Sequence, residues 1–238
     1  MHIIIPMAGD GSRFKGHGLG DYKPLIKIDN TTLVERTINS FDPNKISSLT
    51  FGIRIEHEKK FKVTKQLKKI WPTCNVVTMP RTKGNLETCL KTLLHAKIPP
   101  EESVVFVDCD NPFDKTNILD ICFENGCSIC LLGFIDHERS NKWCYVSHNN
   151  NLVTGVYEKN IASAGCDAIA LIGFFAFKYA RCFEEIAKYV LQENTGVKGE
   201  FYTSQSIKES LCRGEKIAVL IADGFVPMGT AEDVKKIL

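Results

Sequence analysis

The chain has 238 residues, of which 44% are hydrophobic and 24% are charged, and its formal net charge is only +2. This composition is typical of a globular protein that can bury a substantial core without a metal or disulfide framework. The small net charge argues against nucleic acid or an anionic membrane as the main partner, and no apolar run is as long as a membrane span.

The N-terminus and the cysteines bear on the cellular compartment. No basic leader precedes the first apolar run, HIIIP, which is too short for the core of a signal peptide. The ten cysteines are therefore expected to be reduced thiols in a cytoplasmic protein. Cys127 and Cys130 form the one close pair, but they lie in a predicted strand, where positions three apart point to opposite faces. This spacing does not suit a zinc site.

Strands and helices alternate in the first half of the chain. The predicted strands are 2–6, 48–55, 75–80, 103–108 and 127–135. The predicted helices are 32–41, 59–71, 85–96 and 114–125, and the lysines of 59–71 form a solvated basic face. The alternation indicates a mostly parallel sheet with helices on both faces. Ligands of such folds bind at the carboxyl ends of the strands.

The second half has a different pattern. Residues 142–160 are predicted to form two short strands joined by an asparagine-rich turn. Further strands are expected at 167–178 and 216–223, and further helices at 179–192, 202–214 and 230–238. No linker or internal repeat interrupts the sequence. We therefore predict one domain, residues 1–238, with an α/β fold and a small antiparallel insertion beside the parallel sheet.

A glycine-rich segment, MAGDGSRFKG, follows the first predicted strand. Glycines let the backbone turn sharply and approach a ligand, and backbone N–H groups exposed in such a loop attract phosphate. The segment Gly9–Arg13 is interpreted either as a phosphate cradle with Arg13 as an added cation or as a plain turn. It is not a dinucleotide-binding fingerprint, since Phe14 occupies the position of the third glycine. It is not a Walker loop either, since no G-K-[ST] follows four residues after a glycine.

A pair of carboxylates follows the strand at 103–108. Asp108 and Asp110 lie on the same face of an extended chain, at the edge of the sheet where ligands bind. Oxygen ligands at such a position suit Mg²⁺, which commonly shares its coordination with substrate phosphates. The alternative is a turn in which Asp110 caps the following residues. We favour metal binding, with Asp110 as the main ligand.

Several motifs together resemble one family. IIPMAGDGSRF and YKPLIKI resemble the N-terminal signature of the sugar-phosphate nucleotidyltransferases, or nucleoside-diphosphate-sugar pyrophosphorylases. That signature is a strand, a G-x-G-[ST]-R loop and a Lys-Pro-Leu segment. The opening is similar to that of members of the capsule and surface-polysaccharide type. Further segments match in the family's order along nearly the whole chain: TKGNLETCLKTL, VFVDCD, GVYEKN, LIGFFAFK, KGEFYTSQSIKESLCRGEKI and MGTAEDVKKI. The resemblance implies a GT-A-like, Rossmann-like α/β fold.

The resemblance also implies a reaction. A nucleoside triphosphate and a sugar 1-phosphate, or a related phosphomonoester, give a nucleotide sugar and pyrophosphate in the presence of Mg²⁺. Catalysis is assigned to Arg13 on the triphosphate and leaving pyrophosphate, Lys23 near the α-phosphorus and Asp110 on the metal. Such a reaction needs positioning and positive charge rather than a general base, because a phosphate dianion is already nucleophilic.

The resemblance places the two substrates on separate sets of residues. The nucleotide is expected at Ala8, Gly9, Gly11, Ser12, Arg13 and Gly84, and the acceptor at Glu158, Lys159, Gly173 and Glu200. Each position also has a structural interpretation. Lys23 can be an ordinary solvated lysine, Glu158 and Lys159 a solvated pair, and Gly173 a site of close strand packing.

The sequence departs from the family at two points. Pro227 stands where the best-known members have a second metal-binding aspartate, so Asp223 or Asp108 is the candidate replacement. Arg81, Thr82 and Lys83 precede Gly84 in place of the family's usual glutamine, so the preferred base is left open. Relatives with similar openings use cytidine triphosphate and acceptors such as phosphocholine.

Two other classes of function compete with this interpretation. A GT-A glycosyltransferase shares the fold and an Asp-x-Asp motif, but it has no leaving pyrophosphate for a G-x-G-S-R loop and Lys23 to hold. A non-catalytic nucleotide-binding protein is the other alternative, suggested by Pro227. Family members often form dimers or tetramers, so a homo-oligomer remains open.

Overall fold

The computed structural model describes residues 1–14, 16–114, 118–194, 196 and 199–238. Its strands are β1 (His2–Met7), β2 (Lys27–Ile28), β3 (Thr31–Thr32), β4 (Ser48–Arg54), β5 (Asn75–Met79), β6 (Val104–Val107), β7 (Ile129–Phe134), β8 (Cys144–Asn149), β9 (Leu152–Glu158), β10 (Ile169–Phe177) and β11 (Ile217–Ile221). Its α-helices are α1 (Leu33–Ile38), α2 (Ile55–Phe61), α3 (Val63–Ile70), α4 (Asn85–Ala96), α5 (Ile118–Ile121), α6 (Ile161–Ala164), α7 (Ala180–Gln192), α8 (Ser204–Cys212) and α9 (Ala231–Lys235).

Within the described residues, nine strands form one sheet in the order β5-β4-β1-β6-β10-β7-β11-β9-β8, and β2 and β3 form a small second sheet. Pairing is parallel between β1 and its neighbours β4 and β6, between β4 and β5, and between β7 and β11. Strand β10 is antiparallel to both β6 and β7, so these two strands run in the same direction. The carboxyl ends of β1, β4, β5, β6, β7 and β11 therefore meet at one edge, which confirms the predicted α/β architecture.

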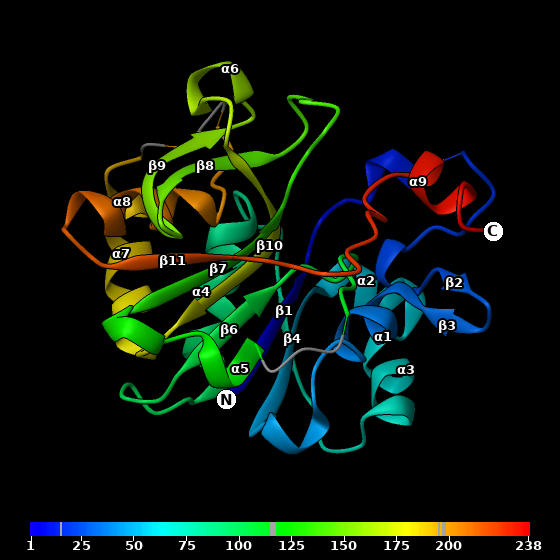
Figure 1. The fold of residues 1–238 in the computed structure, drawn as a ribbon. Coiled ribbons are helices and arrows are strands. Elements are labelled where there is room, and N and C mark those ends of the chain that lie inside the picture. The colour runs from blue at the N-terminus through cyan, green and yellow to red at the C-terminus, as the bar shows by residue number, and fades with distance from the viewer. Residues whose placement is uncertain (15, 115–117, 195, 197–198) are drawn as a thin grey trace.

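Two hydrophobic cores cover the two faces of this sheet. Alternation along β1 divides its buried side chains between them, with Ile3 and Ile5 on one face and Ile4 on the other. The first core includes side chains of α1, α3 and α5, and the second includes side chains of α4, α7 and α8. Figure 1 shows these two groups of helices on opposite sides of the sheet. Strands buried on both faces explain the continuous apolar runs in the sequence.

Two predicted helices differ from the structure. The segment 59–71 is not one helix, because Lys62 adopts a left-handed conformation (φ 53°) that ends α2 and precedes α3. The Glu58 carboxylate accepts hydrogen bonds from the backbone N–H and hydroxyl of Thr64, at 2.8 and 2.9 Å, and so caps α3. The segment predicted at 114–125 contains the short helix α5, and its residues 115–117 lie outside the described residues.

The other elements follow the prediction closely. Asn150 and Asn151 have positive φ in the turn between β8 and β9, the conformation that two-residue hairpin turns require. Thr230 caps α9 in a capping box with Asp233. All ten cysteines are free thiols. No helix among the described residues is long and apolar enough to cross a membrane.

One glycine sets how α4 lies on the sheet. A Cβ atom at Gly52 of β4 would overlap the Thr92 hydroxyl of α4, which donates a hydrogen bond to the Thr88 carbonyl. We expect Gly52→Ala to lower the free energy of unfolding by about 1–3 kcal/mol, because the core must shift to fit one methyl group. Urea denaturation measures the loss.

A second substitution tests the cause. In Gly52→Ala/Thr92→Ala the overlapping hydroxyl is absent, so the double variant should regain part of the stability, and the two effects should not add. If the stability losses of Gly52→Ala and Thr92→Ala simply add in the double variant, contact with Thr92 is not the reason that position 52 requires a glycine.

Candidate active site

The glycine loop connects the carboxyl end of β1 to a short 3₁₀ helix, Ser12–Phe14. Ala8 is buried at the end of the strand, whereas Gly9, Ser12 and Arg13 are exposed. Gly11 has a φ of 58°, which favours glycine, so this residue produces the turn. At Gly9 a Cβ would meet no atom within 4 Å and φ is not positive, so nothing within the described chain itself requires a glycine.

Lys23 and Asp110 form the central ion pair of this edge. Lys23 begins a 3₁₀ helix, Lys23–Leu25, and its ammonium donates a hydrogen bond to the Asp110 carboxylate. The two side chains are only 14% and 10% exposed, so each charge depends on the other for compensation. The same ammonium lies 3.5 Å from the Gly229 carbonyl oxygen. Three distant segments of the chain therefore meet at Lys23.

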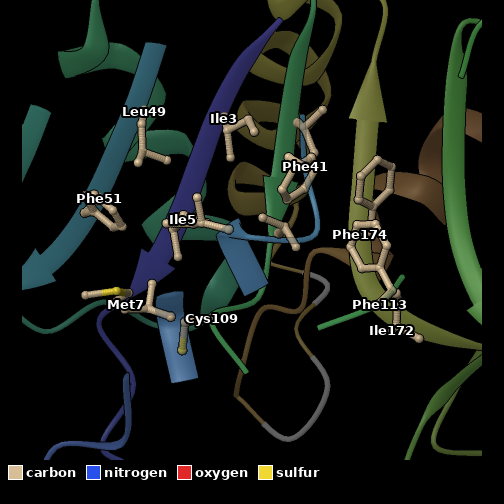
Figure 2. Close-up of a cluster of buried hydrophobic side chains, with 14 of the residues drawn as sticks. Ile3, Ile5, Met7, Phe41, Leu49, Phe51, Cys109, Phe113, Ile172 and Phe174 are labelled. Carbon is tan, nitrogen blue, oxygen red and sulfur yellow. The ribbon is translucent and has the colours of Figure 1, made fainter. Parts of the chain in front are cut away.

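Helix α1 and the residues after it hold the loop that carries Asp110. The Thr37 hydroxyl accepts the N–H of Asn111 at 3.1 Å, and the Ser40 hydroxyl accepts the N–H of Phe113 at 2.9 Å. The Phe113 ring packs edge-on against Phe41, with ring centroids 5.4 Å apart. Figure 2 shows both side chains in the buried cluster. Buried backbone N–H groups need such partners. The position of Asp110 is therefore fixed by both hydrogen bonds and core packing.

Asp108 occupies a different environment at the end of β6. Its carboxylate accepts a hydrogen bond from the Asn85 side chain at the start of α4, at 3.0 Å. A Cβ at Gly173, where φ is 77°, would overlap this carboxylate. Desolvation, followed by the nearby Asp110 charge, raises the pKa of Asp108 from 3.8 to about 7, although Lys23, Asn85 and Arg13 oppose the shift.

Gly173 brings the middle of β10 against Asp108. The Asp108 N–H donates to the Gly173 carbonyl at 3.0 Å, and the register of β10 against β7 shifts between Leu171 and Phe174. The Asn111 side-chain amide donates to the Ile172 carbonyl at 2.5 Å. Close approach to the carboxylate therefore explains the glycine that the sequence placed in the acceptor site.

The segment before α9 also reaches the site, but without a carboxylate. A Cβ at Gly229 would lie 3.6 Å from an Asp110 oxygen and 3.8 Å from an Arg13 guanidinium nitrogen. Arg13 itself has no hydrogen-bond or ion-pair partner in the part of the chain that the structure describes. Asp223 lies by Asp114, whose N–H donates to the Asp223 carbonyl at 2.9 Å. Among the described residues, no three His, Cys, Asp or Glu side chains are grouped as metal ligands.

The predicted acceptor residues meet the segment 200–204, which precedes and begins α8. The Ser204 hydroxyl donates to Glu158 at 2.6 Å. The Lys159 ammonium donates to the Tyr202 hydroxyl at 3.0 Å, and this hydroxyl donates to Glu200 at 2.5 Å. Three of the four predicted acceptor residues are thus brought together, whereas Gly173 lies at Asp108.

Gly84, one of the predicted nucleotide-binding residues, packs against this segment. It has a φ of 147°, and a Cβ there would overlap the Phe201 carbonyl. Hydrogen bonds flank the contact: Phe201 N–H donates to the Lys83 carbonyl, and Leu86 N–H donates to the Phe201 carbonyl, both at 3.0 Å. The glycine is thus required by close backbone packing at the start of α4.

The sequence prediction missed several residues that shape the glycine loop. Asp10 pairs with Arg54, at the end of β4, and with Arg81, after β5, whose guanidinium donates at 2.7 Å. The Tyr22 hydroxyl donates to the Met7 carbonyl at 2.9 Å, which ties the residue before Lys23 to the end of β1. Asp10, Arg54 and Arg81 carry only a weak signal in the sequence, because charged residues after strands are usually solvated. Only their expected position at one sheet edge could have suggested that they meet.

These features meet at the carboxyl edge of the sheet: a glycine loop, an arginine without a partner among the described residues, a lysine–aspartate pair and a second aspartate. The chain belongs to the MobA-like NTP transferase domain family, which it matches over residues 3–210. No curated protein sequence matches it significantly.

Solved structures share the fold. The chain resembles the nucleoside-diphosphate-sugar pyrophosphorylase from Vibrio cholerae RC9, with a TM-score of 0.81 and 20% identity over 99% of each chain. It also resembles the inositol-1-phosphate CTP transferase from T. maritima, with a TM-score of 0.73 and 12% identity over 99% of this chain and 95% of that one. These similarities extend across the whole sheet and confirm the GT-A-like fold.

The raised pKa of Asp108 predicts a pH-dependent stability. In metal-free protein the folded state holds this proton up to about pH 7, whereas the unfolded chain releases it near 3.8. Wild-type stability should therefore fall as pH rises through this window. Asp108→Asn, which can still accept from Asn85, should be more stable than the wild type at pH 8, by on the order of 1–2 kcal/mol.

The advantage of the variant should shrink as pH falls and vanish below pH 3.8, where the aspartate is mostly protonated in both states. Thermal unfolding in EDTA at a series of pH values measures it. A difference that does not change between low pH and pH 8 would show that the buried charge of Asp108 is not the cause.

Proposed function

We propose that this protein transfers a nucleotidyl group from a nucleoside triphosphate to a sugar 1-phosphate or related phosphomonoester and releases pyrophosphate. The observation that carries the proposal is the meeting of Arg13, Lys23 and Asp110 around Gly229, at the end of the glycine loop. Two cations and a carboxylate at one edge suit a reaction between two polyanions.

On the nucleotide side, the loop from Ala8 to Arg13 would hold the triphosphate. The open space around Gly9 supports this assignment, since it leaves the backbone accessible to a ligand. Arg13 has no protein partner to compete with a phosphate in the described structure, and its guanidinium can bind phosphate oxygens in a bidentate manner. Lys23 would hold phosphate oxygens near the reacting phosphorus, as charge develops there.

The residues present fit a magnesium ion. Mg²⁺ is usually bound by one or two carboxylates together with substrate phosphates, and Asp108 and Asp110 are two carboxylates close enough for mutual repulsion to raise the pKa of Asp108. A bound cation would relieve that repulsion. When bound, Mg²⁺ would neutralise charge on the phosphate oxygens. We assign Asp110 and Asp108 as its ligands, rather than Asp223, which lies by Asp114.

On the acceptor side, Lys159 would bind the phosphate of the attacking substrate. Glu158 and Glu200 are the carboxylates nearest to it in this group, and carboxylates accept hydrogen bonds from hydroxyl groups such as those of a sugar. Gly173 adds no side chain, so β10 can lie directly against the Asp108 carboxylate. The contact between Gly84 and Phe201 supports an arrangement in which the two substrates would bind next to each other.

Pyrophosphate release tests the proposal. The protein and Mg²⁺ are incubated with each nucleoside triphosphate and a panel of sugar 1-phosphates and other phosphomonoesters. With the productive pair, Arg13→Ala and Asp110→Asn should each lower kcat/KM by about 100-fold or more, because the first removes a positive charge that would stabilise the transition state and the second removes a ligand of Mg²⁺. Asp223→Asn should leave the Mg²⁺ dependence unchanged.

Asp120→Asn is the matched control, since it removes an aspartate from an exposed pair with Lys45 and should leave turnover unchanged. Transfer from a nucleotide sugar without pyrophosphate release would identify a glycosyltransferase instead. Triphosphate binding by calorimetry without turnover on any acceptor would identify a binding protein. Either result would overturn the proposal.

A further inference from the structure

We infer that Tyr202 is a positioning residue for the acceptor phosphate: its hydroxyl holds the Lys159 ammonium in the direction that binds phosphate. The Lys159 nitrogen lies 3.0 Å from the Tyr202 hydroxyl and 4.5 Å from the centre of its ring. An ammonium has three N–H donors. Tyr202 takes one of them, and no other residue that the structure describes accepts the remaining two, which can bind a ligand.

The direction of the hydrogen bonds supports this role. The Tyr202 hydroxyl donates its proton to Glu200, so its oxygen is left to accept from Lys159. Lysine is a flexible side chain that loses rotamer freedom when it binds a ligand. Holding the ammonium before the ligand arrives removes part of that cost, which is the usual benefit of preorganisation.

The backbone of Tyr202 is itself held firmly. The Gln205 side chain accepts the Tyr202 N–H at 2.8 Å. The neighbouring Phe201 is buried and bonded on both sides to the start of α4. On the other partner, Lys159 has a φ of 52°, and its N–H donates to the Trp143 carbonyl at 3.0 Å. The backbones of Tyr202 and Lys159 are therefore both held in place, and the flexible Lys159 side chain connects them.

The inference rests on the proposed function for the nature of its ligand, a phosphate group. A direct binding experiment tests the inference separately from that function. The protein is labelled with ¹³C at the lysine Cε, and the Lys159 signal is identified by its absence in Lys159→Arg. Inorganic phosphate is the probe. It should shift the Lys159 signal in the wild type, and Tyr202→Phe, which keeps the ring, should weaken this binding about fivefold.

A pH titration of the same signal gives a second reading. Burial lowers the pKa of Lys159, but the Tyr202 hydrogen bond and the charges of Glu158 and Glu200 outweigh it and raise the pKa. Tyr202→Phe should therefore move the Lys159 titration to lower pH. Tyr189→Phe is the matched control, because Arg213 packs on the Tyr189 ring away from the proposed site.

Glu200→Ala provides an independent variant at an exposed position, and it should weaken phosphate binding. Glu200→Gln can still accept the hydrogen bond from Tyr202, so it should weaken phosphate binding less. In the catalysed reaction, Tyr202→Phe should raise the KM for the acceptor about fivefold, with kcat and the KM for the triphosphate unchanged.

Each outcome decides one of the two proposals. If phosphate leaves the Lys159 signal unmoved in the wild type, or binds Tyr202→Phe as tightly as the wild type with the same titration midpoint, the role of Tyr202 is overturned. If phosphate binding depends on Tyr202 but no substrate pair releases pyrophosphate, the inference about Tyr202 stands and the proposed function fails.

Discussion

The buried ion pair of Lys23 and Asp110 is the interaction on which the rest of the site depends. It joins the segment after the glycine loop to the end of β6, and the Gly229 carbonyl adds the segment before α9. A buried charge without its partner is strongly destabilising, so the segments must be held in register by the fold around them. The hydrogen bonds that Thr37 and Ser40 accept, and the one that Tyr22 donates, supply that support.

Close backbone approach is the second feature that shapes the site. Gly173 lies against the Asp108 carboxylate, and Gly84 lies against the Phe201 backbone. In the proposed function, each contact would join an element assigned to the nucleotide to one assigned to the acceptor: β6 to β10, and α4 to the segment before α8. In a reaction of two polyanions the relative placement of the substrates is a major part of catalysis. The glycines set that placement through the backbone, without contributing a side chain.

The arginines around the glycine loop differ in their partners. Arg54 and Arg81 both pair with Asp10, which fixes this loop residue to the ends of β4 and β5. Arg13 instead lies beside Gly229, near Asp110 and without a partner among the described residues. Two arginines therefore hold the loop in place, and in the proposed function the third would bind a substrate.

The sequence by itself determined the strands, most helices, the glycine loop and the pair Asp108–Asp110, because these follow from local periodicity and from where strands end. It could not show the break at Lys62, since a left-handed residue leaves the apolar spacing of a helix unchanged. It also did not show which second carboxylate lies near Asp110, or which residues Tyr202, Thr37 and Ser40 contact. Only the tertiary structure decided these, because each depends on contacts between segments far apart in the chain.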